Sequence, residues 1–167
     1  MKRIVIAALL SVFVAAPAFA ADGKNSVGIN YGTDLNGVFG IQGQFDISSM
    51  VDKQPISVQV FYKRASESIS AFGLTATTVT TGMGAAGIYD LSSVFKLGNK
   101  KIQPYAGAGL ILEKTTVNGS NTFPSSSASK NDLYYTLGAR YFFTPQFDAD
   151  LNYNQFGGLT FGANYNF

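Results

Sequence analysis

Residues 147–154 read FDADLNYN, and this stretch decides the fold class. Each odd-numbered position carries an apolar or aromatic side chain, and each even-numbered position carries Asp or Asn. Successive side chains of a β-strand point to opposite faces, so the stretch predicts a strand with one apolar and one polar face. No stretch of residues 21–167 holds apolar residues at helical spacing for three turns. A period of two therefore predicts an all-β chain.

The same alternation, followed outward from this stretch, predicts seven further strands. It is strongest at residues 133–143 and 102–113 and at the C-terminus, residues 159–167. Weaker alternation predicts the other four strands, at residues 26–33, 38–48, 55–63 and 79–91. Together these segments predict an eight-stranded antiparallel up-and-down transmembrane β-barrel.

The connections between the predicted strands differ in length. Residues 64–78 and 115–130 are predicted as long polar loops, and residues 144–146 as a tight turn. Residues 49–54 and 92–100 form connections of intermediate length. Long loops at one end and shorter turns at the other are the pattern of an outer-membrane barrel, with the long loops outside the cell.

Volume predicts which face of each strand points outward. The interior of an eight-stranded barrel is just wide enough for its side chains to fill, and the rings of the apolar face would overfill it. The apolar face is therefore predicted to contact lipid, and the face with Gly, Asn, Gln and a few charges to line the lumen. A secreted, lipocalin-like soluble barrel would invert the faces and is the alternative. The rings assigned to the lumen are Phe61, Tyr105, Tyr134 and Phe142.

The first twenty residues have the pattern of a secretory signal peptide. Lys2 and Arg3 precede an apolar run, and Ala18-Phe19-Ala20 provides a small-x-small cleavage site. We predict a signal peptide at 1–20, a barrel domain at 21–167 and export to the bacterial outer membrane. An uncleaved anchor is the alternative, although the apolar run is short for a membrane span. Residues 21–167 carry ten basic and ten acidic residues, so the domain has no net charge to attract nucleic acid.

The composition excludes most catalytic chemistry. The sequence has no His and no Cys, which removes the usual general base, the commonest metal ligand and the thiolate nucleophile. No pair of carboxylates suited to acid–base catalysis is apparent in the sequence. We therefore predict no enzymatic activity, no metal and no cofactor.

A few charged residues fall on positions that alternation assigns to the lumen. Counting from the turn at 144–146 places Phe143 opposite Phe147, Phe142 opposite Asp148 and Arg140 opposite Asp150. We predict a lumen ion pair of Arg140 and Asp150, with Asp148 beside it. It could act as a buried polar plug or as a charged gate. The other predicted lumen charges are Asp46 and Asp90 near the periplasmic end, and Lys63 and Glu113 near the outer end.

Three segments carry a resemblance to a known family. The C-terminal residues Phe161, Gly162, Tyr165 and Phe167 resemble the assembly signal of bacterial outer-membrane barrels, which ends in Phe with an aromatic residue two positions earlier. Residues 104–110 and 137–153 resemble strands of small barrels of the opacity protein and outer membrane protein X type. The predicted architecture resembles this family over residues 21–167, whereas the sequence motifs resemble it only in the second half of that range.

The resemblance implies a structural or surface-interaction role, in adhesion or envelope integrity. It points to no single activity, because fold alone does not fix function. A narrow channel for ions or small solutes is the alternative. The implied partners are outer-membrane lipid and lipopolysaccharide, and the barrel assembly machinery through the C-terminal strand. Host or cell-surface ligands would bind the predicted loops 64–78 and 115–130.

Overall fold

The computed structural model describes residues 25–71, 74–97, 101–118 and 125–167. The predicted signal peptide therefore lies outside the described residues. Within these residues no helix is long and apolar enough to cross a membrane. They form a short 3-10 helix, η2 (Ser48–Met50), and the strands β1 (Ser26–Gly32), β2 (Val38–Asp46), β3 (Ile56–Ala71), β4 (Leu74–Asp90), β5 (Ile102–Asn118), β6 (Ser126–Thr144), β7 (Phe147–Asn154) and β8 (Gly158–Asn166).

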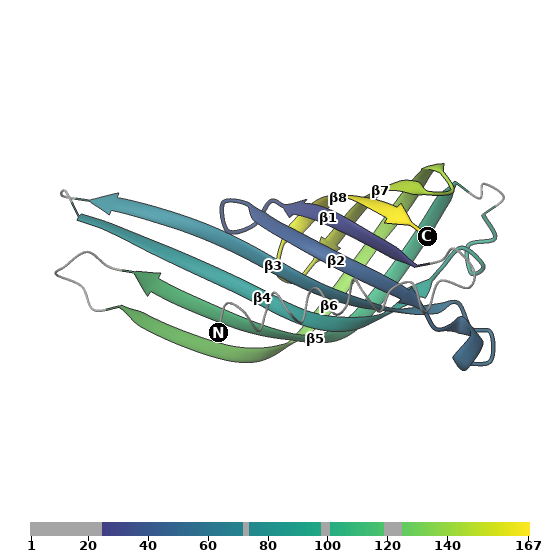
Figure 1. Cartoon of the computed structure of the whole chain (residues 1–167), viewed down its shortest axis with the longest axis horizontal. Coiled ribbons are helices and arrows are strands. Elements are labelled where there is room, and N and C mark those ends of the chain that lie inside the picture. Colours follow the sequence, from purple (N-terminus) through teal and green to yellow (C-terminus); the bar gives the residue numbers. More distant parts are fainter. Residues whose placement is uncertain (1–24, 72–73, 98–100, 119–124) are drawn as a thin grey trace.

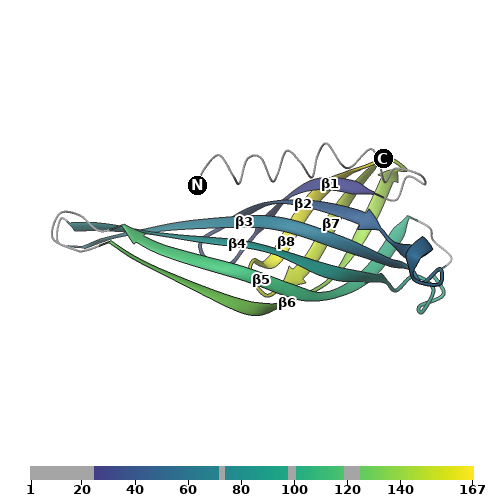
Figure 2. The same cartoon turned by 60° about the horizontal axis from the view of Figure 1, so that its bottom comes forward.

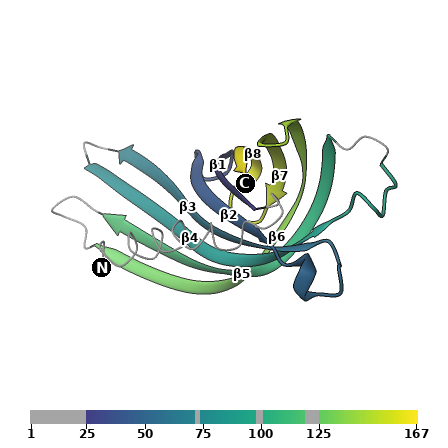
Figure 3. The ribbon, with the colours of Figure 1, turned by 45° about the vertical axis from the view of Figure 1, so that its right-hand side comes forward.

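The strands form one closed barrel (Figure 3). Each strand pairs antiparallel with its sequence neighbours, and β1 also pairs with β8, where Ser26 lies opposite Asn166. The predicted eight-stranded up-and-down barrel is confirmed. We call the end with Ser26 and Asn166 the termini end. The opposite end, where the pairs β3–β4 and β5–β6 project, is the hairpin end (Figure 1).

The two faces of the barrel wall are those that the sequence predicts. In β7 the even-numbered residues Asp148 to Asn154 are buried, whereas Phe147 and Tyr153 are 55% and 54% exposed. An apolar outside around a polar inside excludes the soluble alternative and fits a barrel surrounded by hydrocarbon. Large side chains exposed on the outside of the wall include Ile29, Tyr31, Phe39, Leu110, Leu133, Tyr135, Leu137, Tyr141, Phe143, Leu151, Phe161 and Tyr165.

The prediction of long loops at 64–78 and 115–130 is wrong, because most of both segments is strand. β3 continues to Ala71, and β4 starts at Leu74. Likewise, β5 continues to Asn118, and β6 starts at Ser126. Beyond the hydrocarbon both faces of a strand contact water, so the apolar–polar alternation ends although the pairing continues. The β-branched Thr and Val residues of 75–81 and 115–117 favour strand all the same.

The tight turn after β6 differs from the prediction by one residue. Arg140 lies opposite Asp150 and Phe142 opposite Asp148, as predicted, but Thr144 and not Phe143 lies opposite Phe147. A register shift between Phe142 and Thr144 leaves Phe143 unpaired, so the expected Phe143–Phe147 pair does not form. The backbone N–H of Phe147 donates to Thr144 Oγ1 at 3.1 Å, which stabilises the shorter turn.

Gly109 on the lumen face of β5 allows β4 and β5 to approach closely. A Cβ atom there would lie 2.5 Å from Ala86 Cα, a backbone atom that cannot move aside. We expect Gly109→Ala to lower the free energy of unfolding by about 1–3 kcal/mol through overpacking. Gly87→Ala is the control, because its Cβ would meet only Ala108 O at 3.9 Å. Equal effects of the two variants in urea titrations of the refolded barrel would contradict this packing.

Candidate functional site

The lumen near the termini end holds both members of the predicted ion pair, joined indirectly. Arg140 and Asp150 are 6% and 3% exposed. The Arg140 guanidinium donates to Gln44 Oε1 and lies over the Tyr105 ring, 4.8 Å from its centre. The Tyr105 hydroxyl donates to Asp150 Oδ1 at 2.8 Å. Among the described side chains Arg140 and Asp150 thus share Tyr105 as an intermediary and make no direct ion pair.

The middle of the lumen is filled by amide side chains around Gln42. Its Oε1 accepts hydrogen bonds from Asn30 at 3.0 Å and from Gln59 at 3.2 Å, and its Nε2 donates to Asn164 at 3.0 Å. Asn164 in turn donates to the buried Asp148 at 2.7 Å. Asp148 therefore accepts from the amides of Asn164 and Asn166, and among the described side chains it forms no ion pair with Arg140.

Lys63 lies in the part of the lumen nearer the hairpin end, and the residue is 2% exposed. Its ammonium group donates to Asn154 Oδ1 at 2.7 Å and to the Tyr134 hydroxyl at 3.3 Å. It also lies 5.6 Å and 5.3 Å from the ring centres of Phe61 and Tyr134. Amide dipoles and ring faces can hold a buried cation in this way. The buried side chains of Val38, Ile111 and Phe156 complete this layer.

The remaining predicted lumen charges lie at the two rims. At the termini end, Asp46 and Asp90 each accept the backbone N–H two residues later, from Ser48 at 2.8 Å and from Ser92 at 2.7 Å. Both carboxylates thus hold the start of a connection. At the hairpin end Glu113 forms an ion pair with Lys130 at 3.2 Å. Asp46 and Asp90 thus line the mouth of the lumen together with Arg140, whereas Glu113 lies at the opposite rim.

Sequence reasoning missed the residues that connect the charges, above all Gln42, Gln44, Tyr105 and Asn154. Alternation does place all four on the inner face. However, these residues bind partners that are distant in the sequence. Gln42 and Asn164, for example, are 122 positions apart. Pairing within one hairpin predicted the Arg140–Asp150 register, but contacts across the lumen depend on barrel closure and side-chain length.

The second structural feature is a sheet that projects beyond the barrel at the hairpin end. β2 pairs with β3 only as far as Ala65, and β7 pairs with β6 only from Thr136. Beyond those points β3, β4, β5 and β6 continue as a four-stranded sheet (Figures 1 and 2). We call this region the projecting sheet. Within the described chain, β3 pairs with β4 alone at 66–71, and β6 pairs with β5 alone at 126–134.

Polar cross-strand contacts hold the projecting sheet together. Ser68 and Thr77 hydroxyls lie 3.0 Å apart, and Thr80 and Thr115 hydroxyls 3.3 Å apart. Lys130 bridges Asp132 and Glu113, and hydrogen bonds to these two carboxylates raise its pKa. The sheet is thus built for water on both faces, and its two outer strands have open edges.

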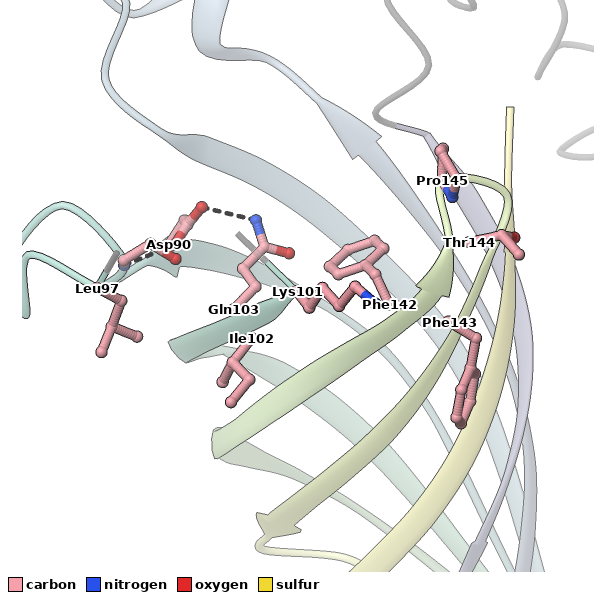
Figure 4. Close-up of a pocket in the computed structure, with 10 residues that line it drawn as sticks. Asp90, Leu97, Lys101, Ile102, Gln103, Phe142, Phe143, Thr144 and Pro145 are labelled. Carbon is pink, nitrogen blue, oxygen red and sulfur yellow. Dashed lines mark hydrogen bonds between the residues drawn. The ribbon is translucent and has the colours of Figure 1, made fainter. Parts of the chain in front are cut away.

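Described residues at the termini end line two cavities of different size. One, of about 220 Å³, forms the mouth of the lumen and is lined by Asp46, Asp90 and Arg140 among others. The other, of about 540 Å³, lies between the β4–β5 connection and the β6–β7 turn (Figure 4). No group of three or more acidic side chains that could hold a metal ion occurs in the described residues.

The comparisons with known proteins agree with this geometry. A closed barrel with an apolar outer band and a polar, filled lumen defines the class of small transmembrane β-barrels. The family model of the outer membrane protein beta-barrel domain matches residues 5–167, so the chain belongs to this family and to the outer membrane. No curated protein matches.

Three solved structures show the shared fold. The N-terminal β-barrel domain of Pseudomonas aeruginosa OprF has a TM-score of 0.57 at 15% identity, covering 87% of this chain and 98% of that one. Yersinia pestis Ail, the attachment invasion locus protein, solved with the heparin analogue sucrose octasulfate, has a TM-score of 0.55 at 16% identity, covering 86% and 96%. Neisserial surface protein A has a TM-score of 0.54 at 20% identity, covering 86% and 94%.

Proposed function

We propose that this protein is a closed outer-membrane barrel that presents the projecting sheet to partners outside the cell. The single observation that carries the proposal is the open edge of β6 at residues 126–134, which pairs with β5 alone. An open edge offers a row of backbone N–H and C=O groups to an extended chain. The proposed binding mode is β-augmentation, in which a partner segment adds a strand to the sheet.

The charge pattern of the projecting sheet favours an extended polypeptide over a polyanion. Ail was solved with a sulfated heparin analogue. Here, however, Lys130 is neutralised by Glu113 and Asp132. Ser125 and the first six residues of β6, 126–131, are all exposed. They are Ser, Ala, Lys and Asn residues. Small polar side chains leave the backbone edge accessible and supply no concentrated positive charge.

The proposal is tested with a library of twelve-residue peptides on phage, selected against the protein in lipid nanodiscs. In the test variant, residues 114–129 are replaced by Asn-Gly, which joins the ion-paired Glu113 and Lys130 through a hairpin turn. In the control variant, only residues 119–124 are replaced by Asn-Gly, which keeps the β5 and β6 strands. We expect peptides with alternating apolar residues to be enriched by the wild type and the control but not by the test variant. No enrichment over empty nanodiscs, or equal enrichment by the test variant, would exclude edge binding.

A channel is the second candidate, and the filled lumen argues against it. The Gln42 amide cluster and the Lys63 layer cross the lumen with hydrogen-bonded side chains, among which Asn30, Asn164, Lys63 and Asn154 are buried. We therefore expect the folded protein to give no conductance steps above the background in planar bilayers. Stable steps from folded wild-type protein would place the channel function ahead of the closed barrel.

We propose no catalytic activity, because the sequence lacks His and Cys. We also propose cleavage after Ala20, so that the mature chain starts at Ala21. N-terminal sequencing of protein purified from outer membranes would check the cleavage site, and a retained Met1 would contradict it.

A further inference from the structure

We propose that the 540 Å³ cavity at the termini end binds one glycerophospholipid of the periplasmic leaflet, with a headgroup that carries a phosphate and a primary ammonium. This site lies at the opposite end of the barrel from the projecting sheet. The proposal depends on the membrane setting of the family and not on the proposed surface interaction.

The position of the cavity fits the boundary between hydrocarbon and water. Its wall includes Ile102 at the start of β5 and Phe143 at the end of β6 (Figure 4). Both belong to the lipid-facing set and are 40% and 63% exposed. Asp90 and Gln103 of the same cavity belong to the inner face, and Asp90 also lines the mouth of the lumen. The cavity therefore runs from the outer face of the barrel wall to its polar rim, the depth at which headgroups lie.

The β4–β5 connection provides the second, independent observation. Val94 and Phe95 are 59% and 60% exposed, and Leu97, which lines the cavity, is 42% exposed. Three exposed apolar side chains within four positions would be unfavourable in water, whereas the interfacial layer of a bilayer accommodates them. Lys96 and Lys101 are exposed beside them, where long cationic side chains can reach phosphates while their stems contact apolar groups.

The charges in the cavity select the headgroup. Lys101 can bind a phosphate oxygen. Asp90 is held by hydrogen bonds from Gln103 Nε2 at 2.6 Å and from the Ser92 N–H at 2.7 Å, without an ion-pair partner among the described side chains. A primary ammonium can donate to Asp90, whereas a quaternary choline cannot donate and a glycerol headgroup brings no positive charge. The match is thus to phosphatidylethanolamine.

Native mass spectrometry of the full barrel released from nanodiscs tests the site. Nanodiscs made with phosphatidylethanolamine, phosphatidylcholine or phosphatidylglycerol each supply one probe lipid. We expect one retained phosphatidylethanolamine per barrel and about fivefold less retention of the other two lipids. Lys101→Gln should lower phosphatidylethanolamine retention about fivefold. The control Lys53→Gln, an exposed Lys in the β2–β3 connection, should leave it unchanged.

A second measurement does not depend on lipid retention. The sequence has no Trp, so Phe95→Trp and Met50→Trp each introduce a single fluorophore into a connection at the termini end. Phe95 lies two positions from Leu97, which lines the cavity, whereas Met50 is also exposed but belongs to the β2–β3 connection, of which no residue lines the cavity. We expect lipids brominated on the acyl chains to quench Trp at position 95 more than at position 50. Equal quenching, equal retention of the three lipids, or equal effects of Lys101→Gln and Lys53→Gln would each overturn the proposal.

Discussion

Arg140→Ala is expected to lower the free energy of unfolding of the barrel by about 3–5 kcal/mol, because it removes the buried cation that Tyr105 links to the buried Asp150 carboxylate. The Arg140 side chain also holds Gln44 and covers the Tyr105 ring, so its loss opens a polar gap in the lumen. Urea titration of the barrel refolded in lipid vesicles measures the change. Arg64→Ala is the control, because Arg64 is exposed on β3, and it should change stability by less than about 0.5 kcal/mol.

A double-mutant cycle separates the charge effect from lost packing. Asp150→Asn removes the charge but keeps an oxygen that can accept from Tyr105. If Arg140 and Asp150 are coupled through Tyr105, the double variant will be less destabilised than the sum of the two single variants. Simple additivity would show that the two residues do not interact. Conductance in either single variant at little cost in stability would instead identify the layer as a gate.

Phe167→Gln is expected to reduce the folded barrel in the membrane to a small fraction of the wild-type level. Phe167 extends β8, its N–H donates to Asn25 O at 2.9 Å beside the β1–β8 closure, and its ring stacks on Tyr165 with centres 6.3 Å apart. The loss of one partly exposed ring accounts for at most about 1.5–3 kcal/mol. A larger deficit in assembly than in stability would support the proposed C-terminal assembly signal.

The matched control for this prediction is Phe143→Gln. Phe143 is also an exposed aromatic residue near the termini end, but it belongs to β6, which does not pair with the C-terminal strand β8. Heat-modifiable mobility of outer-membrane fractions measures the folded amount. If both variants reach the same level, Phe167 has no role beyond that of a lipid-facing ring.

The barrel and its two faces could be predicted because alternation is a local property. In FDADLNYN the side-chain period alone assigns Asp150 to the lumen and Tyr153 to lipid, and both assignments are confirmed. The hairpin count likewise gave the Arg140–Asp150 register. It was wrong at Phe143 because a register shift at the turn leaves no trace in the apolar pattern.

The projecting sheet and the lumen network could not be predicted in the same way. Residues 64–71 and 126–130 lack alternation because water surrounds that part of the sheet, so a polar loop and a polar strand look alike in sequence. In the lumen, Tyr105 separates Arg140 from Asp150 and Gln44 takes the guanidinium. Those contacts join strands on different sides of the barrel, and no local pattern specifies them.

The most direct test of a membrane-inserted barrel with its projecting sheet outside the cell is single-cysteine labelling. The sequence has no Cys, so Ser129→Cys on β6 and Gln146→Cys in the β6–β7 turn each provide one thiol at an exposed position. A membrane-impermeant maleimide is applied to intact and to permeabilised cells. We predict that Ser129→Cys is labelled on intact cells and Gln146→Cys only after permeabilisation. Labelling of Gln146→Cys but not Ser129→Cys on intact cells would contradict the account.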